Sequence, residues 1–296
     1  MWSDLERPPL RQDVLHRALV VPAGPYQALD VVATVPSTNT ALAAAARQGA
    51  LDRTVLVAEH QTAGRGRAAR GWVAPARSGL TLSVLLRPTE VPQPRWSWLP
   101  LLVAVALGRT VSMLGELPAA LKWPNDLLLG SQRRKAGGIL AEVVPPSSNS
   151  SPAVVVGIGL NVTLRPDELP VPDATSLAIE QAACTDRDPL LRALLRALDT
   201  ELRQWCQYEG DPVASGLREA YQQRCATLGE QVGVELPGQP AFTGTAVEID
   251  AEGRLVVLSG GQRRALSVGD VTHIRETHQR REVCSTGPEE DDRNRT

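Results

Sequence analysis

The residues with the clearest chemical potential lie in QTAGRGRAARGW, residues 61–72, where arginine alternates with glycine and alanine. Five arginines and no acidic residue fall between Gln61 and Pro88. Guanidinium groups match phosphate and carboxylate oxygens in a fork geometry, and glycine lets backbone N–H groups turn inward. This pattern indicates an anionic ligand gripped by a mobile loop. A solvated, flexible basic loop explains the stretch equally well when it is taken alone.

Three further motifs contain residues suited to a ligand site. In KWPNDLLL, turn-forming residues place Asn125 and Asp126 between two extended segments, with Lys122 beside them. In RRKAGGILAE, Lys135 precedes two glycines that allow a ligand to approach the backbone. Taken singly, these are an ordinary turn and an exposed basic hairpin. GIGLN contains a GxG, but without a third glycine and a following helix it does not predict a dinucleotide site.

The elements that must position these motifs alternate between strands and helices. LDVVATV, TVLVAEH and LTLSVLLR are rich in β-branched residues and predict strands, the last two on either side of the arginine loop. STNTALAAAARQG predicts a capped helix. Residues 96–114 are apolar almost all round and predict a buried helix. Residues 189–228 show helical spacing up to Trp205 and predict a second helix around Leu217 to Cys225. Between them lie three short extended segments that carry the other motifs.

The character of the chain changes near its end. From Gln231 to Ile274, short alternating runs are separated by PGQP, DAEG and SGG, which is typical of a small all-β module. We expect residues 1–28 to be poorly ordered, residues 29–228 and 229–275 to form two domains, and residues 276–296 to be a disordered tail. The fold class is α+β.

Bulk properties exclude several classes of protein. A net charge of −2 and a pI near 6.1 argue against a surface that gathers nucleic acid or anionic lipid as a whole. The four cysteines form no CxxC pair, which argues against zinc and disulfides. No signal peptide is readable, and the uncharged run between Arg95 and Arg109 is shorter than the roughly 18 residues of a spanning helix. We therefore expect a cytoplasmic protein.

In this order and spacing, the motifs together resemble the biotin protein ligase family. Any one of them is a weak signal, whereas the whole set in register makes chance a poor explanation. The matching segments are STN (37–39), EHQTAGRGR (59–67), KWPND (122–126), KAGGILAE (135–142), GIGLNV (157–162) and DATSL (173–177).

The resemblance implies a catalytic domain similar to the class II aminoacyl-tRNA synthetase core, followed by an SH3-like barrel. It implies a ligase that converts biotin and Mg²⁺-ATP into biotinyl-5′-AMP and transfers biotin to a lysine of a biotin carboxyl carrier domain. That domain would belong to an acyl-CoA or pyruvate carboxylase. We expect a monomer or weak homodimer, with no membrane partner.

The resemblance also implies roles for individual residues. Lys135, Arg67 and Asp126 are the implied catalytic residues, with Asp126 the candidate to accept a proton from the incoming lysine. The residues implied to bind biotin are Ser37, Thr38, Asn39, Gln61, Gly64, Arg65, Trp72, Lys135 and Gly138. Those implied to bind ATP or the adenylate are Arg65, Arg67, Arg70, Lys122, Asn125, Asp126, Lys135 and Asn161.

Three features depart from the family pattern. Ala69 stands where the family usually has glycine, so the loop would be strained by about 1–2 kcal/mol if that position needs a positive φ. The residues before Ser37 are rich in proline and leave no room for a helix-turn-helix, so we expect no DNA operator binding. The polar tail, residues 276–296, is not part of the family pattern.

Other functions remain open on the sequence alone. A lipoate or octanoate ligase or transferase of the same fold is the nearest alternative. A nucleic-acid-binding protein that uses the arginine loop, and an inactive module that binds the carrier domain, are further ones.

Overall fold

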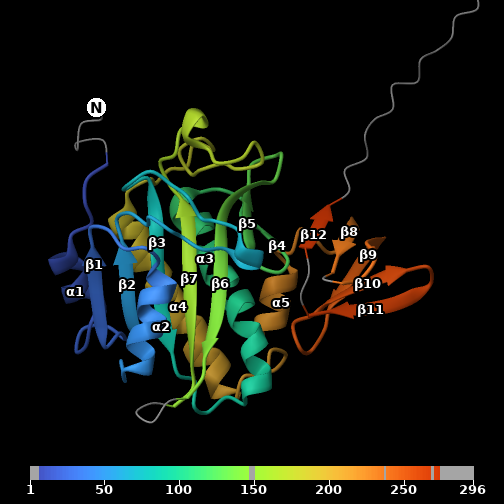
Figure 1. Ribbon diagram of the computed structural model, residues 1–296, viewed down its shortest axis with the longest axis horizontal. Coiled ribbons are helices and arrows are strands. Elements are labelled where there is room, and N and C mark those ends of the chain that lie inside the picture. Colours follow the sequence, from blue (N-terminus) through green and yellow to red (C-terminus); the bar gives the residue numbers. More distant parts are fainter. Residues whose placement is uncertain (1–6, 147–150, 237, 268–269, 274–296) are drawn as a thin grey trace, which may run out of the picture.

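A seven-stranded sheet forms the centre of the larger domain in this computed structural model, which describes residues 7–146, 151–236, 238–267 and 270–273. The strand order is β1-β2-β3-β7-β6-β5-β4 (Figure 1). β1 and β2 are parallel and every other neighbouring pair is antiparallel. The strands are β1 (Ala28–Val32), β2 (Thr54–Ala58), β3 (Gly79–Leu86), β4 (Ala120–Lys122), β5 (Asp126–Leu129), β6 (Arg134–Val144) and β7 (Ala153–Asn161).

Helices cover both faces of this sheet. α2 (Thr38–Arg47) packs on one face, and α3 (Leu99–Gly115) and α4 (Arg187–Gln207) pack on the other (Figure 1). The predicted helices are confirmed, including the second one in the region 189–228, where α5 (Leu217–Gln222) follows α4. Short 3₁₀ turns complete this domain: η1 (Arg67–Ala69), η2 (Gln93–Trp98) and η3 (Pro166–Glu168).

The helix α3 is the most apolar element of the chain. Together with η2 it is long and apolar enough to cross a membrane, by length and composition only. However, 72% of the 18-residue stretch that is apolar enough is buried inside the protein, between the sheet and α4. Helices that are apolar all round are typical of the core of a large domain, and α3 fits this description.

A second, five-stranded antiparallel sheet follows α5, with the strand order β11-β10-β9-β8-β12 (Figure 1). Its strands are β8 (Gln231–Glu235), β9 (Phe242–Ile249), β10 (Leu255–Ser259), β11 (Gln262–Leu266) and β12 (Asp270–His273). The alternating runs that predicted this module are therefore confirmed as strands.

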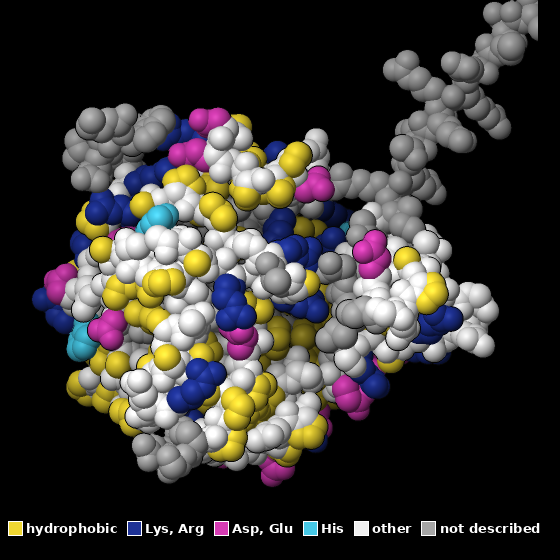
Figure 2. Space-filling model, in the orientation of Figure 1, with side chains coloured by type: hydrophobic (Ala, Val, Ile, Leu, Met, Phe, Trp, Pro, Cys, Tyr) yellow, Lys and Arg dark blue, Asp and Glu magenta, His cyan; other side chains and the backbone are white. Residues whose placement is uncertain are grey.

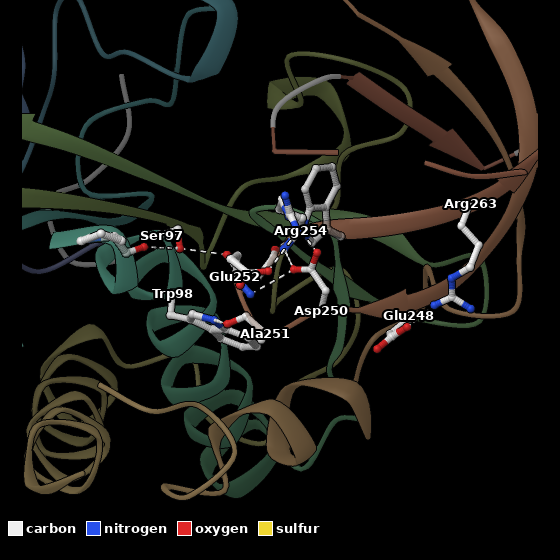
Figure 3. Close-up of polar contacts among 11 residues, drawn as sticks. Ser97, Trp98, Glu248, Asp250, Ala251, Glu252, Arg254 and Arg263 are labelled. Carbon is white, nitrogen blue, oxygen red and sulfur yellow. Dashed lines mark hydrogen bonds and ion pairs between the residues drawn. The ribbon is translucent and has the colours of Figure 1, made fainter. Parts of the chain in front are cut away.

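The turn between β9 and β10 joins the small sheet to the larger domain (Figure 3). The indole of Trp98 donates to the carbonyl of Ala251 at 2.7 Å, and the indole of Trp123 donates to that of Gly253 at 3.1 Å. Gly253 has φ +77 and packs against the ring of Trp98, so a side chain here would strain the turn. Two buried tryptophans thus fix the small sheet beside the KWPND motif.

The prediction that residues 1–28 are poorly ordered is wrong for the described part, residues 7–28. This segment contains α1 (Gln12–Leu19), and the side chains of Leu15, Leu19 and Tyr26 are completely buried. The hydroxyl of Tyr26 donates to the carbonyl of Leu195 on α4 at 2.6 Å. The prolines of this segment led the sequence analysis to predict no helix here. The helix is stabilised because its apolar side is buried against α4. Within residues 7–36 α1 is the one helix described, so this part contains no helix-turn-helix.

The predicted disordered tail, residues 276–296, lies entirely outside the described residues.

Candidate functional site

A cavity of about 330 Å³ opens on the face of the large sheet that carries α2. The floor comes from β3, β6 and β7, and residues 61–73 form one wall. Figure 2 shows basic side chains near the middle of this face. Of the residues implied by the resemblance, these line the cavity: Ser37, Thr38, Asn39, Gln61, Arg65, Arg67, Arg70, Trp72, Asn125, Asp126, Lys135, Gly138 and Asn161.

The end of the cavity beside α2 is polar. Ser37 caps α2 by accepting a hydrogen bond from the N–H of Thr40 at 3.4 Å, so its own proton can be donated elsewhere. The N–H of Thr38 donates to Oε1 of Gln61 at 2.7 Å. The amide nitrogen of Asn39 donates to Glu142 Oε2 at 2.8 Å. Ser37, Thr38 and Asn39 are buried, so this end is prepared for a small polar group.

Glycines on two neighbouring strands create the space that the cavity needs. Gly138 on β6 pairs with Gly159 on β7, and the indole ring of Trp72 lies over both. A Cβ atom on Gly159 would overlap that ring, and one on Gly157 would overlap the side-chain oxygen of Asn39. The glycines of GIGLN therefore admit side chains from outside the sheet, a role that differs from phosphate binding in a dinucleotide fold.

Replacing Gly159 with alanine tests whether Trp72 must lie on the sheet. The added methyl group must displace the indole, so we expect affinity for the ligand of this cavity to fall about tenfold, by analogy with an overpacked core. Isothermal titration with biotin measures the effect. The matched control is Gly108→Ala on α3, where the nearest heavy atom would be 3.6 Å away. Equal affinities in the two variants would contradict this role for Gly159.

Basic side chains converge on the opposite end of the cavity. Nζ of Lys135 forms an ion pair with Asp126 at 2.7 Å, across the β5–β6 hairpin. A guanidinium nitrogen of Arg67 lies 3.4 Å from Oδ1 of Asn125. Arg65 instead lies nearer the polar end, where it forms an ion pair at 3.0 Å with Glu142, the acceptor of the Asn39 amide, and its side chain is 52% exposed. Two cations thus reach the turn of the KWPND motif from different elements, where they can neutralise an anionic ligand.

The backbone around Lys135 is held by the DATSL segment. The N–H of Lys135 donates to the carbonyl of Asp173 at 2.8 Å, and the N–H of Thr175 donates to the carbonyl of Lys135 at 2.8 Å. The amide of Asn161 donates to the carbonyl of Thr175 at 2.9 Å. Lys135 and Asn161 are therefore fixed by the same short segment.

Two residues implied by the resemblance do not line the cavity. Gly64 is a buried residue of the loop itself, where its carbonyl accepts from the N–H of Trp72 at 2.9 Å and a side chain would overlap the Trp72 backbone. Lys122 pairs with Asp126 across the β4–β5 hairpin. Burial lowers the pKa of Lys122, while the Asp126 carboxylate opposes this shift. Lys122 therefore lies outside the cavity, on the strand that holds the KWPND turn in place.

The strain expected at Ala69 falls one residue earlier. In η1 it is Ala68 that has a left-handed backbone, with φ 51 and ψ 41. The loop closes on itself, because the N–H of Gly66 donates to the carbonyl of Arg70 at 2.7 Å. Ala69 is thus not the position where the family's glycine would relieve a positive φ. Local sequence could not show this, since φ at a loop residue depends on how the loop closes.

The sequence did not single out several residues of the site. Val73, Pro170 and Val171 form an apolar rim, of which Val73 is 70% exposed. Ser83 on β3 is completely buried under the polar end, with its hydroxyl 2.7 Å from Oγ1 of Thr38. A polar residue between Leu82 and Val84 in the run LTLSVLLR was the available signal for Ser83.

A second cavity, of about 640 Å³, adjoins the first. Arg67 and Asn125 line both cavities. The far wall comes from the β9–β10 turn, including Glu252 and Arg254, which are held together by an ion pair at 2.9 Å (Figure 3). The small sheet therefore borders an open space that leads to the basic end of the first cavity.

Comparison with known proteins gives two family matches. Residues 31–161 match the Biotin/lipoate A/B protein ligase family, and residues 227–273 match the Biotin protein ligase C terminal domain. The first covers most of the residues that line the cavity, and the second covers the small sheet.

Similar individual proteins span most of the chain. The biotin--[acetyl-CoA-carboxylase] ligase of Mycobacterium tuberculosis is 44% identical over 276 residues, which are 92% of this chain and 98% of that protein. The bifunctional ligase/repressor BirA of Bacillus spizizenii is 31% identical over 84% of this chain and 71% of its own length. Among solved structures, the biotin protein ligase of Aquifex aeolicus in complex with biotin and ATP has a TM-score of 0.68 at 27% identity. The match covers 84% of this chain and 100% of that one.

Proposed function

The chain belongs to the biotin protein ligase family, and from this premise we propose that it joins biotin to a carrier protein with the energy of ATP. In the first step a carboxylate oxygen of biotin attacks the α-phosphorus of ATP, and pyrophosphate leaves. In the second step the amine of a lysine on a biotin carboxyl carrier domain attacks the acyl carbon of biotinyl-5′-AMP. AMP leaves and the amine loses a proton.

The observation that carries this proposal is a cavity with one polar end and one cationic end. Ser37, Thr38 and Gln61 suit the ureido head of biotin, while Trp72 and the glycine floor suit its ring system. Lys135 and Arg67 line the cationic end, where the proposal places the biotin carboxylate and the α-phosphate. Fixed cations at that point stabilise the charge that develops on the phosphate oxygens.

The nucleotide would occupy the part of the cavity between the KWPND turn and Asn161, beneath the apolar rim. Arg70 lies on the loop beside it. Among the described residues no group of three acidic, His or Cys side chains could hold a metal, and Asp126 is the carboxylate that lines the cavity. Mg²⁺ prefers carboxylates together with substrate phosphates, so it would enter as Mg²⁺-ATP near Asp126 and would screen the phosphate charge.

The loop also protects the intermediate. An acyl-adenylate is hydrolysed by water, so a loop that covers it raises the fraction transferred to protein. The acceptor lysine would approach through the second cavity, which meets the first at Arg67 and Asn125. Asp126 is the proposed acceptor of its proton, once the phosphate competes for Lys135. The acceptor is a carboxylase carrier domain, and we place the reaction in the cytoplasm.

A lipoate or octanoate ligase is less well supported, because residues 227–273 match a domain named for biotin protein ligases. The decisive experiment incubates the purified chain with Mg²⁺-ATP, a biotin carrier domain, and either biotin or lipoate. We expect mass spectrometry to show one biotinyl group on the carrier, and none on a carrier whose acceptor lysine is arginine. Preferential transfer of lipoate would overturn the proposal.

A further inference from the structure

We infer that Ser83, which does not line the cavity, is a specificity-determining positioning residue because it fixes the direction of the hydrogen bonds at the polar end. The inference rests on the proposed function, since it concerns how this site selects the ureido head of biotin. Ser83 lies on β3, and its side chain is completely buried beneath Thr38 and Asn39. Its hydroxyl oxygen is 2.7 Å from Oγ1 of Thr38 and 2.7 Å from Oδ1 of Asn39.

The orientation of the Asn39 amide is fixed by its surroundings. The amide nitrogen lies between two oxygen acceptors, the Leu140 carbonyl at 3.1 Å and Glu142 Oε2 at 2.8 Å. The carboxylate of Glu142 is in turn held by Arg65 at 3.0 Å. The Asn39 amide oxygen must therefore face Ser83, and it can only accept a hydrogen bond.

Ser83 has a single proton to share between its two neighbours. Three oxygen–oxygen contacts share the two hydroxyl protons of Ser83 and Thr38, so one contact carries no proton. Because Oδ1 of Asn39 is only an acceptor, we assign the Ser83 proton to Asn39 and the Thr38 proton to Ser83, the two contacts of 2.7 Å. The contact left without a proton is then the longest of the three, the 3.1 Å contact between Oγ1 of Thr38 and Oε1 of Gln61. If Thr38 instead donated to Gln61, a contact of only 2.7 Å at Ser83 would lack a proton. An unpaired contact of this kind is costly in a buried site.

This arrangement leaves two acceptors next to each other on the cavity wall. Oγ1 of Thr38 has used its proton on Ser83, and Oε1 of Gln61 already accepts the N–H of Thr38 at 2.7 Å. Their mutual separation of 3.1 Å brings lone pairs together, which a ligand N–H placed against them relieves. Ser37 beside them can supply a donor. The polar end therefore fits a cyclic urea, whereas a dithiolane ring offers no N–H.

The test compares biotin with a biotin analogue methylated on the ureido nitrogens, in the wild-type chain and in Ser83→Ala. We expect the substitution to weaken biotin binding about tenfold, because Thr38 is then free to point its proton at the ligand. The affinity for the methylated analogue, which has no ureido N–H, should change by less than about twofold. The kcat at saturating biotin and the KM for ATP should stay within about twofold of wild type, since Ser83 touches neither the reacting atoms nor the nucleotide region.

A purely structural role would give a different pattern. The control is Ser215→Ala, which removes another buried serine hydroxyl, one that donates to the Asp211 carbonyl at 2.6 Å and does not line the cavity. It should leave both affinities unchanged. Equal losses for biotin and its methylated analogue in Ser83→Ala, or no loss of either, would overturn the inference. If Ser83→Ala does not fold, Ser83→Cys provides a side chain of similar size that is a weaker hydrogen-bond donor. This variant should bind biotin about threefold more weakly than wild type and should bind the methylated analogue equally well.

The wild-type protein separates this inference from the proposed function. Wild type that binds biotin and the methylated analogue equally well overturns the paired acceptors and leaves the ligase proposal standing. Wild type that binds neither compound overturns both.

Discussion

Replacing Lys135 with alanine should slow the formation of biotinyl-5′-AMP by roughly 10²–10³-fold, the loss typical when one preorganised charge donor to a transition state is removed. Nζ of Lys135 projects from β6 into the cavity and is paired with Asp126 at 2.7 Å. Without it, the carboxylate of biotin and the α-phosphate would meet beside an unpaired Asp126, and repulsion would replace attraction. Biotin-dependent exchange of pyrophosphate into ATP measures the first step directly.

The same hairpin provides a matched control. Arg133 also carries a positive charge and forms an ion pair, with Glu230 at 2.7 Å, but it does not line the cavity. Arg133→Ala should therefore exchange pyrophosphate at close to the wild-type rate. The melting temperatures of both variants should lie within a few degrees of wild type. Wild-type exchange in a folded Lys135→Ala variant would remove Lys135 from the proposed mechanism.

Replacing Arg187 with alanine should destabilise the protein by about 3–5 kcal/mol, because it leaves the Glu59 carboxylate buried without its partner. Both side chains are nearly buried, with exposures of 5% and 8%, and their charged atoms are 2.5 Å apart. Arg187 also donates to the carbonyl of Pro8 at 2.6 Å, and Glu59 accepts from the N–H of Leu10 at 2.6 Å. This pair joins the N-terminal segment, α4 and the strand that leads into the arginine loop.

Urea unfolding followed by circular dichroism measures this loss. Arg17→Ala is the control, because Arg17 also pairs with an acid, Asp13 at 2.8 Å, but both side chains are more than 70% exposed. Exposed pairs contribute about 1 kcal/mol or less. Removing both charges, as in Arg187→Met with Glu59→Gln, should recover much of the stability. A loss in Arg187→Ala no larger than that in Arg17→Ala would refute the assignment.

Much of the fold was predictable, because its signals are local. Strands β2 and β3 and helix α2 were visible as β-branched runs and a capped, alanine-rich segment. The small sheet was visible as alternating runs between turns. α1 was not, since an eight-residue helix has little intrinsic stability and exists here because Leu15 and Leu19 are buried against other elements.

The sequence by itself determined the chemistry of the site. The arginines of the loop, Lys135 and the KWPND turn predicted an anionic ligand, and their order along the chain carried the family resemblance. These conclusions depend on residue types and spacing, which the sequence states directly. Thirteen of the residues implied by that resemblance line one cavity.

Only the tertiary structure decided how these residues act on one another. Ser83 and Asn39 are 44 residues apart and meet through the packing of α2 on β3. The register of β6 and β7 places Gly138 against Gly159 and opens the floor for Trp72. Ala68, and not Ala69, has the left-handed backbone, because the way in which the loop closes determines the dihedral angles of its residues. Contacts between distant segments, strand register and loop dihedrals arise from burial in three dimensions, and no short stretch of sequence contains them.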